Sequence, residues 1–311
     1  MNNNIKTVIF VLILAACASF FGIDQALIEE LTGNPEEQKT EQKTEQKTEQ
    51  KTEQKTEQVE QTEQPAQPKP NKQLGKLNNY LPTTNLGHTL SYGDYFTLSY
   101  SNEHRQAEWV AYEISKEKLE QEDFPRSSFF KSDDRIDEKY RVKHQDYSST
   151  NFDRGHLASA ADFSWGEEAI ETTFYTTNIS PQEPRFNRGI WKKLESAVRG
   201  WAMQYEHVYV VTGPILTERA KKRFPKEKNY IAVPRRYYKV VLNYVDDEPI
   251  AVGFIMKNEY SKSHLSNYVV PIDEIESITG IDFFPELPDD IENELESKIY
   301  LTDWGLNVTD R

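Results

Sequence analysis

Two short stretches of the chain carry side chains that could do hydrolytic chemistry. Asp153-Arg154-Gly155-His156 places an acid, a guanidinium and an imidazole within four residues. Asn187 offers a carboxamide about thirty residues later, and Glu195 offers a carboxylate eight residues after that. Histidine is the commonest base near neutral pH. Asn and Glu oxygens hold hard cations, and arginine stabilises negative phosphate oxygens. These residue types are the ones that phosphodiester hydrolysis requires.

The local spacing supports part of this chemistry and leaves structural alternatives open. In an extended strand, Arg154 and His156 face the same side, where one phosphate could meet both. A lone histidine is more often a core imidazole. Asn187 stands at a helix start, where asparagine commonly caps the helix. The imidazole needs a partner for its second nitrogen, and either Asn178 or a backbone carbonyl could supply it.

Glu195 is the second candidate for holding a cation. In a regular helix, eight residues separate two side chains by about 12 Å along the axis and about 80° around it. We therefore expect Glu195 to reach a cation on Asn187 through water, since Mg²⁺ usually retains several waters. The structural alternative is a solvated carboxylate paired with Lys192 or Arg199.

The elements that position these residues follow from hydrophobic periodicity. Apolar residues at steps of three and four from Gly189 to Tyr205 predict an amphipathic helix of some 15 residues. A shorter helix is expected at 165–173 and an acidic helix and loop region from 271. Residues 115–150 are expected to be mostly loop. Strands are predicted at 95–100, 109–114, 174–179, 208–213, 237–242 and 250–256, with turns at Gly213-Pro214 and 246–248.

These motifs resemble the DNA/RNA non-specific endonucleases of the ββα-metal (His-Me finger) superfamily, which include endonuclease G. The resemblance runs from about Tyr92 to about Leu287. It includes Trp109-Val110-Ala111-Tyr112, Asn178-Ile179-Ser180-Pro181-Gln182 and Val211-Thr212-Gly213-Pro214. It implies an α+β fold with a central, mostly antiparallel sheet flanked by helices. It also implies a Mg²⁺-dependent endonuclease acting on DNA and RNA, with Mn²⁺ as a possible substitute.

The resemblance assigns a role to each candidate residue. His156 matches the general base, and Asn187 matches the direct protein ligand of Mg²⁺. Glu195 matches a residue that holds the metal's water shell. Arg154 and Arg126 match phosphate-contacting arginines, although the loose match through 115–150 leaves Arg135 or Arg141 as substitutes for Arg126. Asn178 matches a supporting asparagine of the site. Relatives are often dimers, so a homodimer is possible.

The charged residues around the proposed ligand are expected to meet the substrate backbone. Arg188 and Lys192 flank Asn187 and suit phosphate binding, with ordinary helix solubility as the alternative. The net charge of −14 argues weakly against a nucleic-acid partner. However, the excess of acidic over basic residues lies in residues 24–72 and 271–311, and residues 73–270 carry 27 acidic and 27 basic residues.

The chain before the expected catalytic body has a different character. Residues 8–23 form an apolar run, read as a signal peptide or membrane anchor within residues 1–23. Leu14-Ala15-Ala16-Cys17 resembles a lipoprotein signal in which Cys17, the only cysteine, becomes lipidated. An uncleaved anchor and a simply cleaved signal are the alternatives. All three possibilities predict an exported catalytic body, periplasmic or extracellular. The lipidated cysteine and the uncleaved anchor would also tether it to a bacterial membrane.

Residues 24–72 are predicted to be a disordered spacer. Lys39 to Gln58 is five tandem Lys-Thr-Glu-Gln copies, followed by a Pro-rich piece, and none of it can build a core. The nuclease domain is placed at 73–311. Two other functions remain open at this stage. One is a metal-dependent phosphodiesterase for a substrate other than nucleic acid, and the other is a tethered, non-catalytic binding module.

Overall fold

The computed structural model describes residues 80–126, 129–225, 230–244 and 249–306. The predicted anchor, the lipidation site at Cys17, the repeat spacer and the turn at 246–248 lie outside the described residues. Within the described part, no helix is both long and apolar enough to cross a membrane.

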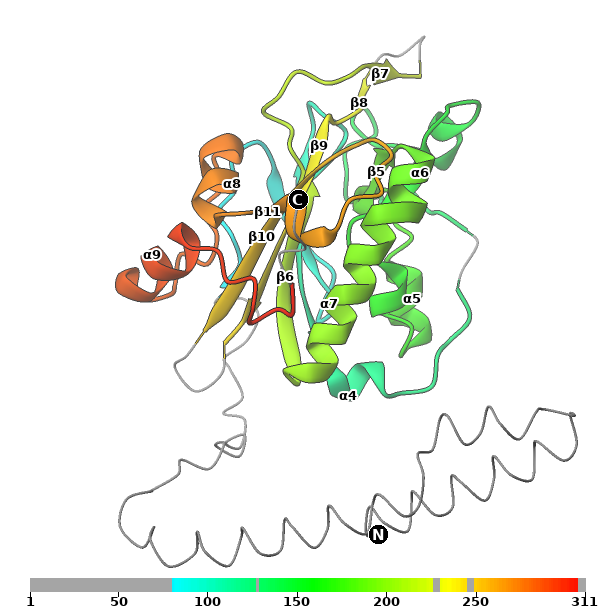
Figure 1. Ribbon diagram of the computed structural model, residues 1–311. Coiled ribbons are helices and arrows are strands. Elements are labelled where there is room, and N and C mark those ends of the chain that lie inside the picture. Colours follow the sequence, from blue (N-terminus) through cyan, green and yellow to red (C-terminus); the bar gives the residue numbers. More distant parts are fainter. Residues whose placement is uncertain (1–79, 127–128, 226–229, 245–248, 307–311) are drawn as a thin grey trace, which may run out of the picture. The chain divides into compact units, whose positions relative to one another are not determined.

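A seven-stranded sheet forms the centre of the fold (Figure 1), in the order β1-β2-β3-β6-β9-β10-β11. All pairings within it are antiparallel. The predicted α+β class with a mostly antiparallel central sheet is thereby confirmed. The strands are β1 His88–Ser91, β2 Thr97–Ser101, β3 Gln106–Ser115, β6 His207–Pro214, β9 Arg236–Asn243, β10 Ile250–Lys257 and β11 Val269–Val270.

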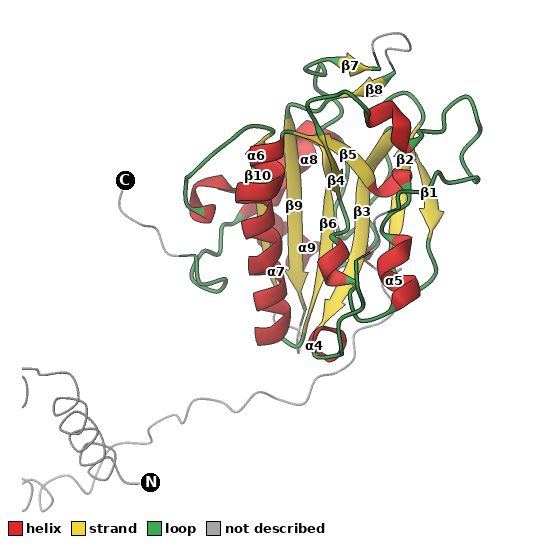
Figure 2. Ribbon diagram, turned by 90° about the vertical axis from the view of Figure 1, so that its right-hand side faces the viewer, coloured by secondary structure: helices red, strands yellow, loops and turns green. Residues whose placement is uncertain are grey.

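The central strands are buried on both faces, which explains their nearly continuous apolar sequences. In β6, Val208 and Val210 pack into one hydrophobic cluster, while Tyr209 and Val211 pack into a second on the opposite face. Successive side chains of a strand point to opposite faces. An unbroken apolar run therefore supplies two cores at once, and the fold has a helical layer on each side of the sheet (Figure 2).

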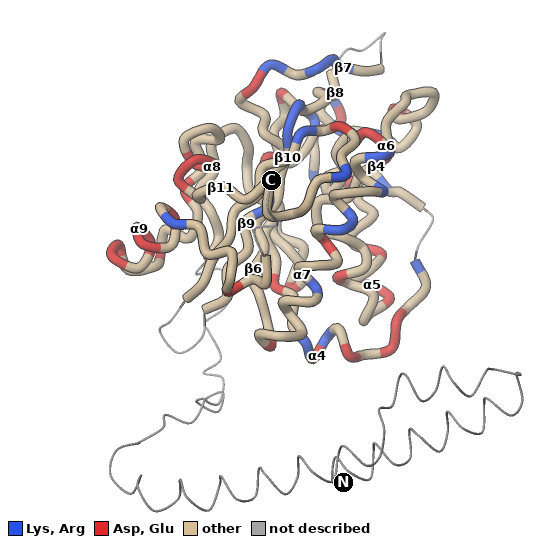
Figure 3. The backbone as a smooth tube through the Cα atoms, viewed as in Figure 1, with Lys and Arg blue, Asp and Glu red and all other residues tan. Residues whose placement is uncertain are grey.

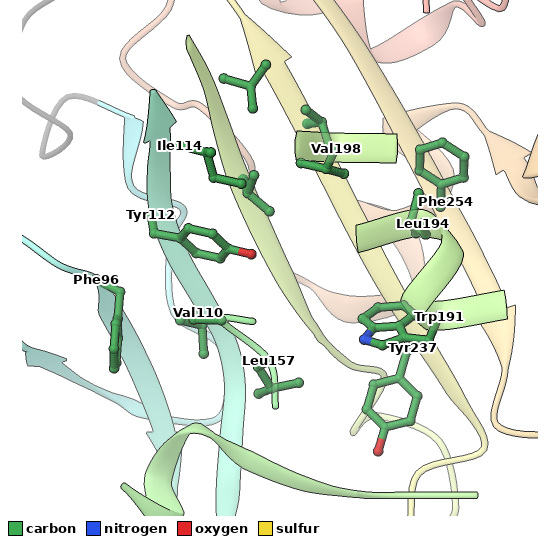
Figure 4. Packing of buried hydrophobic residues seen from close by; sticks show 14 of the residues in the cluster. Phe96, Val110, Tyr112, Ile114, Leu157, Trp191, Leu194, Val198, Tyr237 and Phe254 are labelled. Atoms are coloured by element: carbon green, nitrogen blue, oxygen red, sulfur yellow. The ribbon is translucent and has the colours of Figure 1, made fainter. Parts of the chain in front are cut away.

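Helix α7, Lys192–Gln204, covers the face that carries the candidate site. Its buried residues are Leu194, Val198, Trp201 and Ala202, at the spacing that the sequence predicted. In Figure 4, Leu194 and Val198 point toward the sheet beside Trp191, which precedes the helix. Burying such side chains contributes about 1.5–3 kcal/mol each. This packing anchors the helix that presents Glu195.

Helices α8, Ile272–Thr279, and α9, Asp289–Ser297, cover the opposite face. Ile272 and Ile275 of α8 and Leu295 of α9 are buried in the second cluster. Gly280 ends α8 in the left-handed conformation (φ 69°), which glycine adopts without a Cβ penalty. The acidic C-terminal region predicted from residue 271 is therefore two helices joined by a loop.

A small sheet outside the main one carries the first motif. Strand β4, Asp153–His156, pairs antiparallel with β5, Ile179–Gln182. The extended conformation inferred for Arg154 and His156 is confirmed. Shorter elements complete the described chain: α4 Lys116–Leu119, α5 Glu167–Thr172, α6 Pro184–Phe186, β7 Arg223–Phe224, β8 Ile231–Ala232, a π-helical segment at Asn187–Trp191, and 3-10 turns at His144–Tyr147, Ala160–Asp162, Thr176–Asn178 and Leu265–Tyr268.

Two predicted elements are wrong in detail. Residues 174–178 do not form a strand, because the chain turns there in a 3-10 segment and extends only from Ile179. The side chain of Asn178 bonds the backbone at Thr173 and Ala158, which stabilises the turn. The segment 208–213 continues as strand through Pro214, so Gly213-Pro214 is not the turn that the sequence suggested.

Candidate active site

One pocket collects nearly all the residues that the two motifs singled out. Its volume is about 380 Å³. Its lining residues include members of β4 and α7, two elements that face the viewer in Figure 2. Its lining comprises Arg126, Arg154, His156, Ser159, Ala160, Ala161, Asn187, Arg188, Lys192, Glu195 and Arg199.

His156 is buried, with 7% of its surface exposed. The rings of Phe130 and Phe174 pack against it at centroid distances of 5.6 and 4.7 Å. Its Nε2 atom is buried and makes no hydrogen bond within the described structure. Burial, and to a smaller extent the nearby Arg126 charge, lower the pKa of the imidazole to about 3. His156 is therefore neutral near pH 7, with a ring nitrogen free to accept a proton.

Gly155 allows the two small-sheet strands to approach closely. A Cβ at this position would lie 2.2 Å from the Oε1 atom of the Gln182 side chain. A side chain here would therefore displace β5 or Gln182. The glycine of the motif thus sets the distance between His156's strand and its partner.

Two arginines reach the pocket from different segments. Arg154 donates through Nη2 to the His144 carbonyl (3.1 Å), and its Nε is buried without a recorded partner. Arg126 lines the same pocket with its guanidinium 5.5 Å from the Phe174 ring centre. Its proposed substitutes are bound elsewhere: Arg135 to Asp133, and Arg141 to Asp134. Neither substitute lines this pocket, which favours Arg126.

Asp153 braces the start of the second motif. Its Oδ2 accepts from Asn187 Nδ2 (2.9 Å) and Arg188 Nε (2.8 Å), and its Oδ1 accepts from Arg188 Nη2 (2.6 Å). Because the amide nitrogen of Asn187 is bound, its carbonyl oxygen, Oδ1, is the atom left for a cation. Asp153 therefore holds the side chains of Asn187 and Arg188 in place. The exposed Arg188 guanidinium is held at the pocket's edge.

The helix that separates Asn187 from Glu195 is irregular. Residues Asn187–Trp191 form a π-helical segment, and Gly189 breaks it with φ −108° and ψ −109°. The assumption of a regular helix between Asn187 and Glu195 was therefore wrong, and the separation of the two side chains calculated from it does not apply. The two side chains line one pocket. Irregular turns of this kind often occur at functional sites.

A cluster of charged side chains lies around Glu195. Arg199 donates to Asp162 Oδ1 (2.7 Å) rather than to Glu195, and Tyr112 donates to Asp162 Oδ2 (3.0 Å). Lys239 is 1% exposed, with its Nζ 4.9 Å from the Trp191 ring centre. Burial raises the pKa of the Glu195 carboxyl, an effect that the charges of Lys239 and Arg199 oppose. The alternative prediction, a solvated Glu195 carboxylate paired with Lys192 or Arg199, is therefore wrong.

Asn178 is fully buried and does not line the pocket. Its Oδ1 accepts from the Ala158 amide (2.9 Å), and its Nδ2 donates to the carbonyls of Ala158 and Thr173 (3.0 and 2.9 Å). No recorded bond joins it to the His156 ring. Its position supports a structural role, in which it holds the segment that follows His156.

Sequence patterns did not identify every residue of the site. Ser159, Ala160 and Ala161 line the pocket because the chain turns immediately after β4. Lys239 did carry a signal, since it interrupts the apolar strand Tyr237–Leu242. A lysine within a buried strand requires a nearby negative charge. The carboxylates that act on it are Glu195 and Asp162.

The opposite pKa shifts of His156 and Glu195 predict how activity depends on pH. As pH falls from about 8 to about 6, His156 stays neutral because its pKa is lowered to about 3. Glu195, with its raised pKa, takes up a proton in this range. A divalent cation held through Glu195 is therefore expected to bind up to about tenfold more weakly per pH unit as pH falls. The kcat at a saturating concentration of the cation is expected to change little. Metal titrations at several pH values test this, and a kcat inflection near 6.5 would contradict it.

The family model for DNA/RNA non-specific endonucleases matches residues 75–290. Human mitochondrial endonuclease G is 34% identical over 202 residues, covering 62% of this chain and 68% of its own length. The mitochondrial nuclease of Saccharomyces cerevisiae is 33% identical over 220 residues, covering 65% of this chain and 67% of its own length.

A solved structure gives an independent comparison. The crystal structure of the EndoG/EndoGI complex, determined to explain inhibition of EndoG, contains a chain that superimposes with a TM-score of 0.60 at 29% identity. The match covers 68% of this chain and 91% of the other. The similarity therefore extends through nearly the whole of that chain and is not limited to a short motif.

Proposed function

Because this chain belongs to the DNA/RNA non-specific endonuclease family and is a nuclease that binds and hydrolyses DNA and RNA, we propose that the His156 pocket is its active site and that Mg²⁺ on Asn187 assists the reaction. The observation that carries this proposal is the gathering of His156, Asn187 and Glu195 around one pocket. They come from β4, the irregular segment and α7.

The residues present fit a hard divalent cation. Asn187 Oδ1 and the Glu195 carboxylate are oxygen donors, which Mg²⁺ prefers, and Mn²⁺ accepts the same ligands. Asn187 would be the direct ligand, and Glu195 would hold the water shell. The pocket volume of about 380 Å³ leaves room for such waters. A bound Mg²⁺ supplies positive charge beside the phosphate and the departing oxygen.

His156 provides the base in this proposal. Its buried, neutral Nε2 accepts the proton of a water molecule that attacks phosphorus in line. The apolar rings of Phe130 and Phe174 keep the imidazole neutral before the reaction. Asn178 acts as a positioning residue by holding the backbone after His156.

Arginine and lysine side chains bind the phosphate backbone in this proposal. Arg154 and Arg126 stabilise the charge that develops on the phosphorus oxygens. Arg188 and Lys192, on the exposed edge of the pocket, bind neighbouring phosphates. Backbone contacts carry no sequence information. We therefore expect cleavage with little sequence preference.

Removing the metal is expected to abolish activity on both substrates. The full chain would be incubated with supercoiled plasmid and with RNA, in Mg²⁺, Mn²⁺ or EDTA. Cleavage of both polymers in Mg²⁺, lost in EDTA and restored by excess Mg²⁺, is the expected result. Undiminished cleavage in EDTA would refute the metal role. Hydrolysis of a small phosphodiester that bulk DNA fails to inhibit would favour a different substrate.

We also propose that the nuclease is exported and tethered to a bacterial membrane through residues 1–23. The apolar run 8–23, the lipoprotein-like Cys17 and the polar spacer 24–72 support this. Fractionation of cells producing the full chain, with and without Cys17→Ala, would test it. Protein released by high salt alone would contradict the tether. Homodimer formation stays a prediction, which sedimentation of the full chain tests.

A further inference from the structure

A second cluster of carboxylates lies on the opposite side of the sheet from the nuclease pocket. Asp273 and Glu276 belong to α8, and Glu296 belongs to α9. One carboxylate oxygen from each lies within 4.8 Å of the other two. Figure 3 shows the concentration of acidic residues along these two helices. Asp273 and Glu276 lie inside the stretch that the family model matches, residues 75–290, whereas Glu296 follows it.

Burial distinguishes Glu296 from an ordinary acidic surface residue, whereas Asp273 is exposed and Glu276 is partly buried. Glu296 is only 6% exposed, and its Oε1 atom is buried with no hydrogen-bond partner in the described structure. The nearby Glu292 has a buried Oε1 atom in the same condition. An unpaired buried carboxylate costs several kcal/mol unless a proton or a cation neutralises it. The unpartnered, buried Oε1 of Glu296 is therefore a position where a bound cation would relieve an unfavourable burial.

The electrostatic surroundings contain more negative charge. Burial, together with the carboxylates of Glu276, Glu292, Asp273 and Asp282, raises the pKa of Glu296 to about 9. The pKa of Glu276 is raised to about 7, chiefly by burial and also by neighbouring carboxylates, against the opposing effect of a hydrogen bond from the Phe283 amide. The groups that act most strongly on Glu296 are thus all acidic. A bound cation would relieve this repulsion.

We propose that Asp273, Glu276 and Glu296 form a structural Ca²⁺ site, separate from the catalytic metal. Calcium takes six to eight oxygen ligands at about 2.3–2.6 Å, so ligands on opposite sides of one ion lie about 5 Å apart. The three carboxylate oxygens, all within 4.8 Å of one another, are close enough to bind one such ion. Mg²⁺ demands a near-ideal octahedral geometry and usually keeps several of its waters, whereas Ca²⁺ accepts flexible coordination by several carboxylates.

The ion would join α8 to α9 and strengthen their attachment to the body. The loop after α8 is bonded to residues before β1: the Thr83 amide donates to the Asp282 carbonyl (2.9 Å), and Asn85 Nδ2 donates to the Thr279 carbonyl (2.7 Å). Leu295 packs beside Ile275 in the core of this face. Calcium binding is therefore expected to stabilise the fold and not to take part in phosphodiester hydrolysis.

The test measures Ca²⁺ binding in a chain whose catalytic site is weakened. Full-length Asn187→Ala, freed of metal with a chelator, would be titrated with CaCl₂ by calorimetry and by thermal unfolding. We expect one bound ion per chain and a rise in Tm of about 5 °C or more at a hundredfold excess over Kd. Adding Glu296→Gln is expected to abolish both. The amide has nearly the same shape and removes one of the repelling charges, so the variant should fold without calcium.

A control variant distinguishes Ca²⁺ binding at this site from a general effect of negative charge. Glu294→Gln, which removes an exposed carboxylate of α9 bonded to Lys298 (2.6 Å), is expected to leave the Ca²⁺ response intact. Equal loss in Glu294→Gln and Glu296→Gln would overturn the proposal, because binding would then reflect total charge. Absence of Ca²⁺ binding to the Asn187→Ala chain would overturn it too. Because the readout is stability, the outcome does not depend on whether the nuclease mechanism is correct.

Discussion

Replacing His156 with alanine is expected to lower kcat on DNA and RNA by about 10²–10⁴-fold, the range for loss of a general base. The reason is that Nε2 of this ring is buried, unpaired and held neutral, which is the state a base needs before the reaction. Substrate binding should change little, because the arginines of the pocket remain. Single-turnover cleavage and filter binding of the variant would measure the two effects separately.

Folding must be checked, because the replaced ring is packed against Phe130 and Phe174. His156→Gln keeps more of the side-chain volume and should show the same loss of kcat. His264→Ala removes an exposed histidine outside the pocket, and it should cleave at the normal rate. A folded His156→Ala chain with near-normal kcat would refute the mechanism.

Replacing Asn187 with alanine is expected to raise the Mg²⁺ concentration for half-maximal activity by at least about 10–100-fold. Loss of a residue that only hydrogen-bonds to a metal ligand already has an effect of this size. The change removes Oδ1, the oxygen proposed to bind the ion. It also removes the hydrogen bond from Nδ2 to Asp153 (2.9 Å). Activity measured against Mg²⁺ concentration would reveal the shift.

Asn187→Asp distinguishes a ligand from a structural brace. Like the alanine variant, it loses the bond from Nδ2 to Asp153, but it keeps an oxygen for the cation. If Asn187 binds the metal, the aspartate variant should need much less Mg²⁺ than the alanine variant. Equal impairment of the two would mean that Asn187 serves to hold Asp153 and the start of the irregular segment, as a helix cap would.

The sequence alone supported the residue types and several elements of the site. The Arg154–His156 alternation predicted an extended segment with both side chains available to one phosphate, and β4 confirms the extended conformation. The three- and four-residue steps after Gly189 predicted the buried face of α7. These predictions succeeded because local hydrophobic periodicity reflects local backbone geometry.

Other features depended on contacts between distant segments. Arg126 could not be chosen over Arg135 and Arg141 until the structure placed it on the pocket and bound the others to Asp133 and Asp134. The 174–178 stretch has strand-like composition, yet Asn178 holds it as a turn through bonds to Ala158, twenty residues away. Periodicity carries no information about such contacts.

The sequence by itself therefore determined the chemical groups, their order and the family to which the chain belongs. Only the tertiary structure decided that Asn187 and Glu195 meet at one pocket, because the break at Gly189 ends the regular helix geometry from which their separation was calculated. Only it brought Glu296 of α9 against Asp273 and Glu276 of α8. Such meetings depend on how helices pack against the sheet, which residue spacing along one segment does not specify.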